Sequence, residues 1–338
     1  MPHSYSESEI QNLGDDVSID SEEFNNTVVA MDQLTLGSTP LDGLTDKQLE
    51  ILKKFTQMFE DDRSKLTQLQ QYYCFHDRFC FVRYLKARDW DIPNATKLLK
   101  SSLTWIESSY KPFSLTAKQL WLEASPAKTY IKGHDKAGRP IIYLHAGRDF
   151  TNDPATGVSL LVYNLIAASY RMGPNGSQMT WICDFSSYTT KSAPPLAVCK
   201  QAVEILSSHF PERLGLCLMV FAPKVFYWFF KLISPLIPPV TKQKIQFCKG
   251  TKQKDMRAFF EPFVDMSQLE KKYGGDQDFT YNHKEMWAHE IEHDLKRLHK
   301  IKEAGGMKPE EADALINEPI IDTLEKHNKF FKARHASK

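Results

Sequence analysis

The spacing of hydrophobic positions divides the chain into a helical first part and a second part in which strands alternate with helices. From position 45 onward, apolar residues recur at intervals of three and four: Leu49, Leu52, Phe55 and Phe59. Similar stripes predict a second helix over about 76–89 and a third that begins at Pro93. We therefore expect a small all-helical unit over 41–126.

Beyond residue 127, short and continuously apolar runs alternate with helical patterns. The predicted strands are 127–132, 140–146, 181–184, 216–221 and 245–248, and the predicted helices between them are 158–172, 195–209 and 224–234. This alternation is typical of βαβ units, and continuously apolar strands are typical of a sheet covered on both faces. We expect an α/β fold with a small, mainly parallel sheet over 127–275. A C-terminal helical extension follows over 276–338, with helices at about 283–303 and 308–333.

The apolar stretch over 214–240 is long enough to span a membrane. However, Lys224 and Lys231 lie within it, and four prolines interrupt it. Charged side chains are unfavourable in hydrocarbon, so a buried strand followed by an apolar helix is the better interpretation.

The helix expected at 224–234 has the most unusual composition in the chain. Four of its residues share one face: Phe226, Phe229, Phe230 and Ile233. Tyr227, Trp228 and Lys231 lie off that face, so the helix is apolar nearly all round. Such a helix is either buried on every side or in contact with lipid, and the composition leaves both alternatives open.

The formal net charge of +1 conceals an uneven distribution. Residues 1–40 hold eight acidic and no basic residues and are expected to be disordered, while the rest of the chain carries 43 basic against 34 acidic residues. Between 213 and 254 there are eight basic residues and no acidic one. A local excess of this kind favours an anionic membrane surface as partner. The overall balance argues against a strongly basic nucleic-acid binder.

Common catalytic and nucleotide-binding motifs are absent from the sequence, with one exception. His289-Glu290-Ile291-Glu292-His293 matches the H-E-x-x-H pattern of zinc peptidases, in which two histidines bind zinc and the glutamate acts as base. The helix around it is very polar, which favours a solvated surface instead, so the peptidase remains a minor alternative. Six cysteines without a C-x-x-C pair suit a reducing, cytoplasmic compartment.

Several blocks of sequence resemble a known family. The segment from Arg83 to Asp91 looks like the helical signature of CRAL-TRIO lipid-binding proteins, and further blocks at 134–140, 209–215, 239–245 and 273–275 follow in the family's order. The resemblance covers about 45–280 and is to the fungal secretory-pathway phosphatidylinositol-transfer proteins. Residues 143–148 and 281–283 look most like the branch linked to azole and multidrug resistance.

The resemblance implies a pocket for one phospholipid, closed by a mobile helix, and a protein without catalytic residues, metal or cofactor. The family's headgroup positions fall on four residues: Arg88, Glu212, Thr241 and Lys244. In such a site the two cations bind phosphate, the threonine donates a hydroxyl, and Glu212 accepts from inositol hydroxyls while pairing with Lys244. The pocket and gate positions are Trp181, Phe226, Phe229, Phe230 and Ile233.

One departure from the family changes the expected ligands. Members that also carry phosphatidylcholine have small hydroxyl residues where this chain has Met179 and Trp181. The expected function is therefore phosphatidylinositol transfer, with a sterol or another phospholipid as possible second ligand and a sterol carrier as the alternative. Further expected partners are an anionic membrane surface and a phosphatidylinositol kinase, with the protein cytoplasmic and peripheral to membranes.

Overall fold

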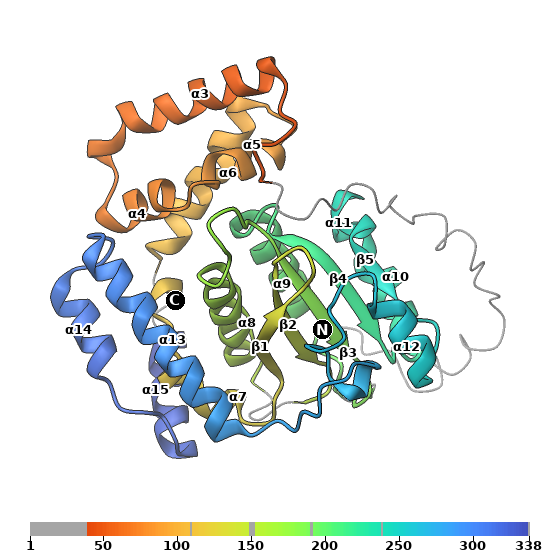
Figure 1. Ribbon diagram of the computed structural model, residues 1–338. Helices are drawn as coiled ribbons and strands as arrows, with labels where there is room; N and C mark the ends of the chain where they lie inside the picture. Colours follow the sequence, from red (N-terminus) through yellow and green to blue (C-terminus); the bar gives the residue numbers. More distant parts are fainter. Residues whose placement is uncertain (1–38, 109, 149–152, 190–191, 238, 337–338) are drawn as a thin grey trace, which may run out of the picture.

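A five-stranded sheet in the order β1-β2-β3-β4-β5 lies at the centre of the chain (Figure 1). The computed structural model describes residues 39–108, 110–148, 153–189, 192–237 and 239–336. Its strands are β1 (Thr129–His134), β2 (Pro140–His145), β3 (Met179–Asp184), β4 (Leu214–Val220) and β5 (Ile245–Phe247). Only the β1–β2 pair is antiparallel, so the mainly parallel sheet expected from the alternation of strands and helices is confirmed.

Helices cover both faces of this sheet because successive strand residues point to opposite sides. On one face Ile142 and Met179 join a large apolar cluster with α8 (Pro154–Ser169) and α9 (Leu196–His209). On the other face Ile182 and Leu218 pack with α12 (Gln253–Phe260). The helix α10 (Lys224–Ile233) packs on the first face as well, over Cys183 of β3 and over Cys217 and Met219 of β4.

The helices before the sheet are more numerous than the pattern predicted. They are α3 (Asp46–Asp61), α4 (Gln68–His76), α5 (Cys80–Lys86), α6 (Ile92–Ile106) and α7 (Ala117–Ala124). The helix expected over about 76–89 is present as the shorter α5, whereas α4 and α7 were not expected. Between α4 and α5, the Asp77 carboxylate accepts a hydrogen bond from the Phe79 N–H. Asp89 and Trp90, with φ of 49° and 66°, lie beyond the end of α5.

The C-terminal extension packs against the helical unit and α8 (Figure 1). Its first helix, α13 (His283–Glu303), has the predicted bounds. The single helix predicted over 308–333 is instead two, α14 (Pro309–Asn317) and α15 (Leu324–Ala336). Pro319 disfavours helical backbone at Glu318, and the Glu318 carboxylate accepts hydrogen bonds from Thr116 and Gln119 instead.

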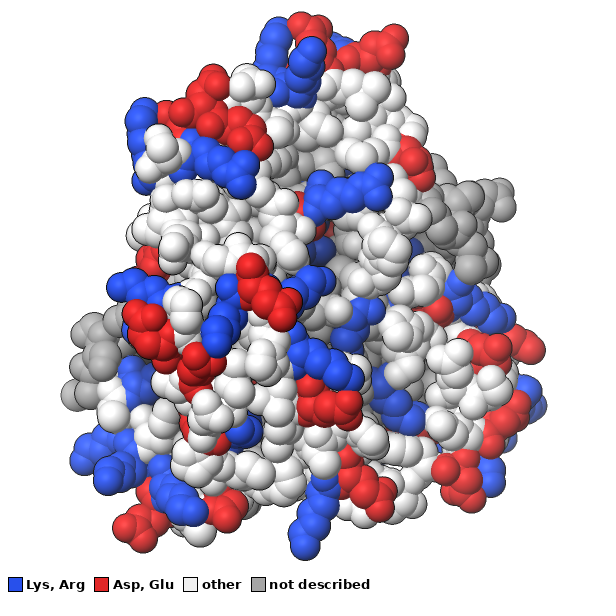
Figure 2. All heavy atoms as spheres, turned by 60° about the vertical axis from the view of Figure 1, so that its left-hand side comes forward, with Lys and Arg blue, Asp and Glu red and all other residues white. Residues whose placement is uncertain are grey.

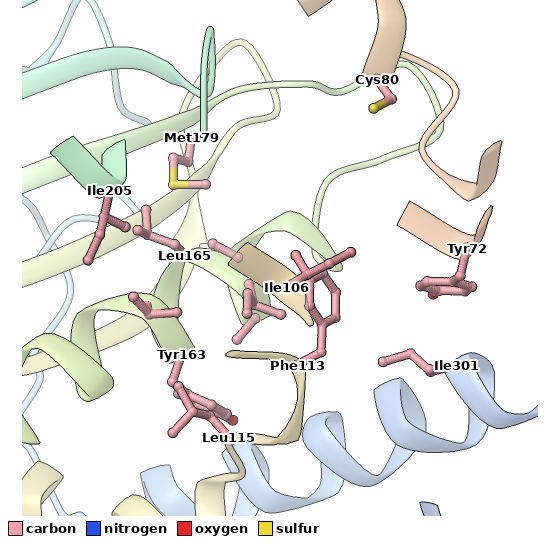
Figure 3. Close-up of a cluster of buried hydrophobic side chains, with 14 of the residues drawn as sticks. Tyr72, Cys80, Ile106, Phe113, Leu115, Tyr163, Leu165, Met179, Ile205 and Ile301 are labelled. Atoms are coloured by element: carbon pink, nitrogen blue, oxygen red, sulfur yellow. The ribbon is translucent and has the colours of Figure 1, made fainter. Parts of the chain in front are cut away.

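One apolar cluster joins the helical unit, the sheet and the extension (Figure 3). Tyr72 of α4, Ile106 of α6, Leu165 of α8, Met179 of β3 and Ile301 of α13 all belong to it. This cluster therefore holds the helical unit, the sheet and the C-terminal extension together as one core.

The apolar stretch at 214–240 forms β4 and α10, as the interrupted pattern predicted. Among the described residues, no helix has both the length and the apolar character needed to cross a bilayer. The acidic segment predicted to be disordered lies, up to residue 38, outside the described residues.

Candidate functional site

Glu212 and Lys244 meet where β4 and β5 begin. Glu212 lies in the turn between α9 and β4, and Lys244 directly precedes β5. Since these strands are parallel neighbours, their amino-terminal ends lie side by side, and Cys217 N–H donates to the Lys244 carbonyl at 2.8 Å. Lys244 Nζ lies 3.5 Å from Glu212 Oε2, with both side chains largely shielded from solvent. A carboxylate and an ammonium group are thus placed together at one edge of the sheet.

The side chains of the other two predicted headgroup residues are not hydrogen-bonded to this pair among the described residues. The guanidinium of Arg88, in the turn after α5, donates to the Ala87 carbonyl at 2.7 Å. Thr241 lies half-buried in the short helix α11 (Pro239–Gln243), and its carbonyl accepts from the Lys244 N–H. Within the described residues, no hydrogen bond joins either side chain to Glu212 or Lys244.

Lys86, which the sequence analysis did not single out, adds a third cation near the pair. It is the last residue of α5, and its ammonium group donates to the Pro40 carbonyl at 2.7 Å. Burial lowers the pKa of Lys86, an effect that the Glu212 carboxylate opposes and the Lys244 charge reinforces. The amino-terminal unit therefore contributes positive charge to this edge of the sheet.

A buried network that the sequence analysis also missed holds the Glu212 turn in place. Asp77 Oδ2 lies 2.5 Å from Arg83 and 2.7 Å from Arg213, and Arg83 also donates to the Pro211 carbonyl at 3.0 Å. Burial alone would raise the pKa of the Asp77 carboxyl, but the two guanidinium groups outweigh it and hold that pKa well below its ordinary value. Arg83, the first residue of the signature from Arg83 to Asp91, therefore has a structural role: it ties α5 to the turn that carries Glu212.

The aromatic helix α10 packs on the sheet through one face. Phe226 and Phe230 are buried in a cluster with Cys183, Cys217 and Met219 of β3 and β4, while Ile233 is only partly buried. Phe226 also contacts Phe185, with ring centroids 4.0 Å apart. Lys231 is exposed, so the helix has an outer face as well as a packed one. The side chain of Phe229 lies outside the described residues.

Trp181 lies on the sheet face that α10 covers. Its ring contacts both the cluster under α10 and the larger cluster of α8 and α9. Among the described residues its buried indole N–H has no hydrogen-bond partner. Met179, on the same strand, is buried, and Thr180 between them points to the opposite face and donates to Asp135. The apolar region beneath α10 thus contains one unused hydrogen-bond donor.

Seven of the eight basic residues counted between 213 and 254 divide into two groups, and Lys242 of α11 is half-buried. Arg213 and Lys244 form the internal ion pairs described above. Five others are exposed on α10, on the segment before α12 and in the first turn of α12: Lys224, Lys231, Lys249, Lys252 and Lys254. By contrast, Figure 2 shows basic and acidic side chains interspersed on the face brought forward from the left of Figure 1, where α13 to α15 lie.

The H-E-x-x-H segment has a structural role. Glu290 of α13 is buried, and its carboxylate accepts hydrogen bonds from Tyr163 and Arg171 of the α8 region at 2.9 and 2.6 Å. His289 and His293 are exposed. Within the described residues no group of three potential metal ligands gathers. The zinc-peptidase alternative is therefore wrong: its proposed base is an interior ion-pair partner.

Comparison with known proteins identifies the family. The CRAL/TRIO domain matches residues 125–275, and the CRAL/TRIO N-terminal domain matches residues 50–101. The phosphatidylinositol transfer protein PDR17 of Saccharomyces cerevisiae is 31% identical over 68% of this chain and 67% of its own length. A CRAL-TRIO domain-containing protein of Schizosaccharomyces pombe is also 31% identical, over 64% of this chain, which spans only 20% of that protein.

The fold has a counterpart among solved structures. The crystal structure of Sfh5 superposes with a TM-score of 0.58 at 14% identity, covering 76% of this chain and 97% of that one. The sheet order, the helical unit before it and the matched sequence segments agree with one another. The chain belongs to the CRAL/TRIO family of lipid-binding proteins.

Proposed function

We propose that this protein binds one phosphatidylinositol molecule and exchanges it with membranes. The observation that carries the proposal is the Glu212–Lys244 pair at the edge of the sheet, next to the segment that follows α10. The relative named as a phosphatidylinositol transfer protein supports it. In this proposal the acyl chains occupy the region between α10 and the sheet face that carries Trp181, and α10 moves outward to admit them.

The headgroup contacts determine which lipid is selected. Moving acyl chains from a bilayer into an apolar pocket changes the free energy little, because both surroundings are apolar. Charge-assisted hydrogen bonds contribute about 1.5–3 kcal/mol each, enough for a few of them to discriminate between lipids. Lys244 and Arg88 would bind the phosphate, Thr241 would donate its hydroxyl, and Glu212 would accept from inositol hydroxyls.

Membrane docking would use the surface of α10 and the segment after it. Each of the exposed lysines there contributes about 1 kcal/mol toward an anionic bilayer. Docking through this surface would place α10 at the membrane when the lipid leaves or enters. A protein that docks in this way would act in the cytoplasm, peripherally on membranes, and would present phosphatidylinositol to a kinase or carry it between bilayers.

The headgroup assignment is tested by replacing Lys244 and Glu212 separately with alanine. Each variant is expected to lose about tenfold or more of phosphatidylinositol transfer between vesicles, because each loses a charge-assisted contact with the headgroup. Lys284→Ala is the matched control, since it removes an exposed lysine of α13 that lies outside both the headgroup site and the docking surface. Transfer that survives in both variants, with Lys284→Ala unchanged, would show that the headgroup binds elsewhere.

A sterol is a second candidate ligand, and the Trp181 indole favours it. A sterol has one hydroxyl on an apolar body, which matches a single unused donor in an apolar region. Trp181→Phe keeps an aromatic ring but removes the donor, so sterol binding is expected to weaken about threefold to tenfold while phosphatidylinositol transfer persists. The measurement is a titration with a fluorescent sterol. Unchanged sterol affinity would remove Trp181 from that role.

A further inference from the structure

A separate cavity of about 240 Å³ lies between α4, the carboxyl end of α8 and α13. Tyr72 and Tyr170 line it and join their hydroxyl groups at 2.7 Å, and Phe113 lines it from the segment before α7. Figure 3 shows Tyr72 and Phe113 approaching the same region from α4 and from the chain after α6. Its lining includes none of the proposed headgroup or gate residues, so it is a different site from the one described above.

Aromatic rings form much of the wall of this cavity. The rings come from the helical unit, from α8 and from the turn after α9: Tyr72, Tyr73, Phe79, Phe113, Tyr170 and Phe210. The imidazole of His76 stacks on Tyr72 with ring centroids 4.5 Å apart and also lines the cavity. Walls of this kind favour a flat, apolar or aromatic body over a hydrated one.

The same cavity carries an excess of positive charge. Arg78, Arg83, Arg213 and Lys300 line it, and Asp77 is the one acidic residue among its lining residues. Asp77 is already shared by Arg83 and Arg213, while Arg78 and Lys300 lie exposed at the mouth. In addition, the Nε atom of Arg83 is buried and has no hydrogen-bond partner among the described residues. Four cations against one carboxylate favour an anionic ligand.

The size of the cavity limits that ligand. Its volume is below the range of about 300–1,000 Å³ typical of sites for drug-sized molecules, and it corresponds to roughly eight water molecules at about 30 Å³ each. Such a space is too small for a two-chain phospholipid. It accommodates one ring with one charged group.

We propose that this cavity binds a compact, soluble aromatic anion, with its ring between the aromatic walls and a phosphate or carboxylate group against Arg78 and Lys300. Arginine offers the forked geometry that phosphate and carboxylate accept, and Lys300 adds a second charge from the opposite wall. The proposal is independent of phosphatidylinositol transfer, because it uses other residues.

The test is calorimetric titration of the full chain with phenyl phosphate, alongside benzoate, phenol and inorganic phosphate. Phenyl phosphate is expected to bind saturably and about tenfold or more tightly than phenol or inorganic phosphate, since only it uses both the rings and the cations. The affinity for benzoate is expected to lie between that for phenyl phosphate and that for phenol. Binding of inorganic phosphate as tight as that of phenyl phosphate, or no saturable binding at millimolar concentration, would overturn the proposal.

Two variants and a spectroscopic signal locate the site. Lys300→Ala and Arg78→Ala are each expected to weaken phenyl phosphate binding by about tenfold, whereas Lys284→Ala, an exposed lysine of the same helix, is expected to leave it unchanged. Burial and the charge of Lys300 lower the pKa of His76. A bound anion should raise that pKa, which a nuclear magnetic resonance titration of His76 measures. Equal binding in all three variants, or a His76 pKa that does not rise, would place the anion elsewhere.

Discussion

Replacing Asp77 by alanine is expected to lower the free energy of unfolding by about 3–5 kcal/mol, because it leaves two buried guanidinium groups without their shared carboxylate. Arg83 and Arg213 are 3% and 11% exposed, so water does not compensate for the loss. The measurement is urea denaturation followed by circular dichroism. Asp62→Ala is the matched control: Asp62 pairs with Lys65 on the surface, where solvent screens the pair, and its loss should leave stability nearly unchanged.

The same variant should also impair the proposed headgroup site. Arg213 adjoins Glu212, and Arg83 holds the Pro211 carbonyl, so the turn that carries Glu212 depends on the Asp77 network. Equal stability of the Asp77→Ala and Asp62→Ala proteins, with transfer also unchanged, would contradict the role assigned to the network. Normal stability with reduced transfer would instead limit that role to positioning the turn.

The pH dependence of the stabilisation by Asp77 follows from the direction in which the pKa of its carboxyl is shifted. The pKa of Asp77 lies well below its ordinary value of 3.8 because the two arginines outweigh the effect of burial. Its stabilisation is therefore fully present above that ordinary value and is lost only as the pH falls through the lowered pKa. The stability difference between the native chain and Asp77→Ala should stay constant from neutral pH to about pH 5 and shrink only in stronger acid.

The sequence predicted the sheet well because its strands are buried on both faces and read as continuous apolar runs. It failed where a single side chain decides the local structure. Between α4 and α5, the Asp77 carboxylate accepts the Phe79 N–H, and Pro319 with Glu318 divides the C-terminal helix; neither effect alters the apolar periodicity. The periodicity therefore extended α5 beyond both of its ends, missed α4, and fused α14 with α15.

The candidate site was predictable only in part. The neighbouring amino-terminal ends of β4 and β5 follow from parallel strand order, which brings Glu212 to Lys244. The partners of Asp77 could not be found from spacing, because Arg213 lies 136 positions further along the chain. Glu290 illustrates a false positive from the sequence. It matches the H-E-x-x-H motif literally, but its carboxylate faces the interior and pairs with Arg171.

Replacing Phe226 by alanine is expected to loosen α10 without unfolding the rest of the protein. Phe226 and Phe230 attach this helix to the sheet through a small cluster that is separate from the two larger ones. Phe221, with φ of 56°, and Pro223 precede the helix, and Pro235 follows it, so the chain is interrupted at both ends. Removing a buried phenyl ring typically destabilises a folded structure by about 3–5 kcal/mol. Here the removal should lower the free energy of local opening of α10 and leave the rest of the domain folded.

Hydrogen exchange measured by mass spectrometry separates local from global opening. Peptides over 224–236 should exchange faster in Phe226→Ala, while the thermal midpoint changes little. Phe260→Ala is the matched control, because Phe260 is fully buried in the cluster on the opposite sheet face and its loss should lower the midpoint of the whole domain. If both variants lower the midpoint equally, α10 unfolds only with the domain and cannot open by itself. If α10 opens alone, the apolar region beneath it becomes accessible while the Glu212–Lys244 pair stays in place at the start of β4 and β5. Local opening of α10 would then supply the motion that lipid exchange requires.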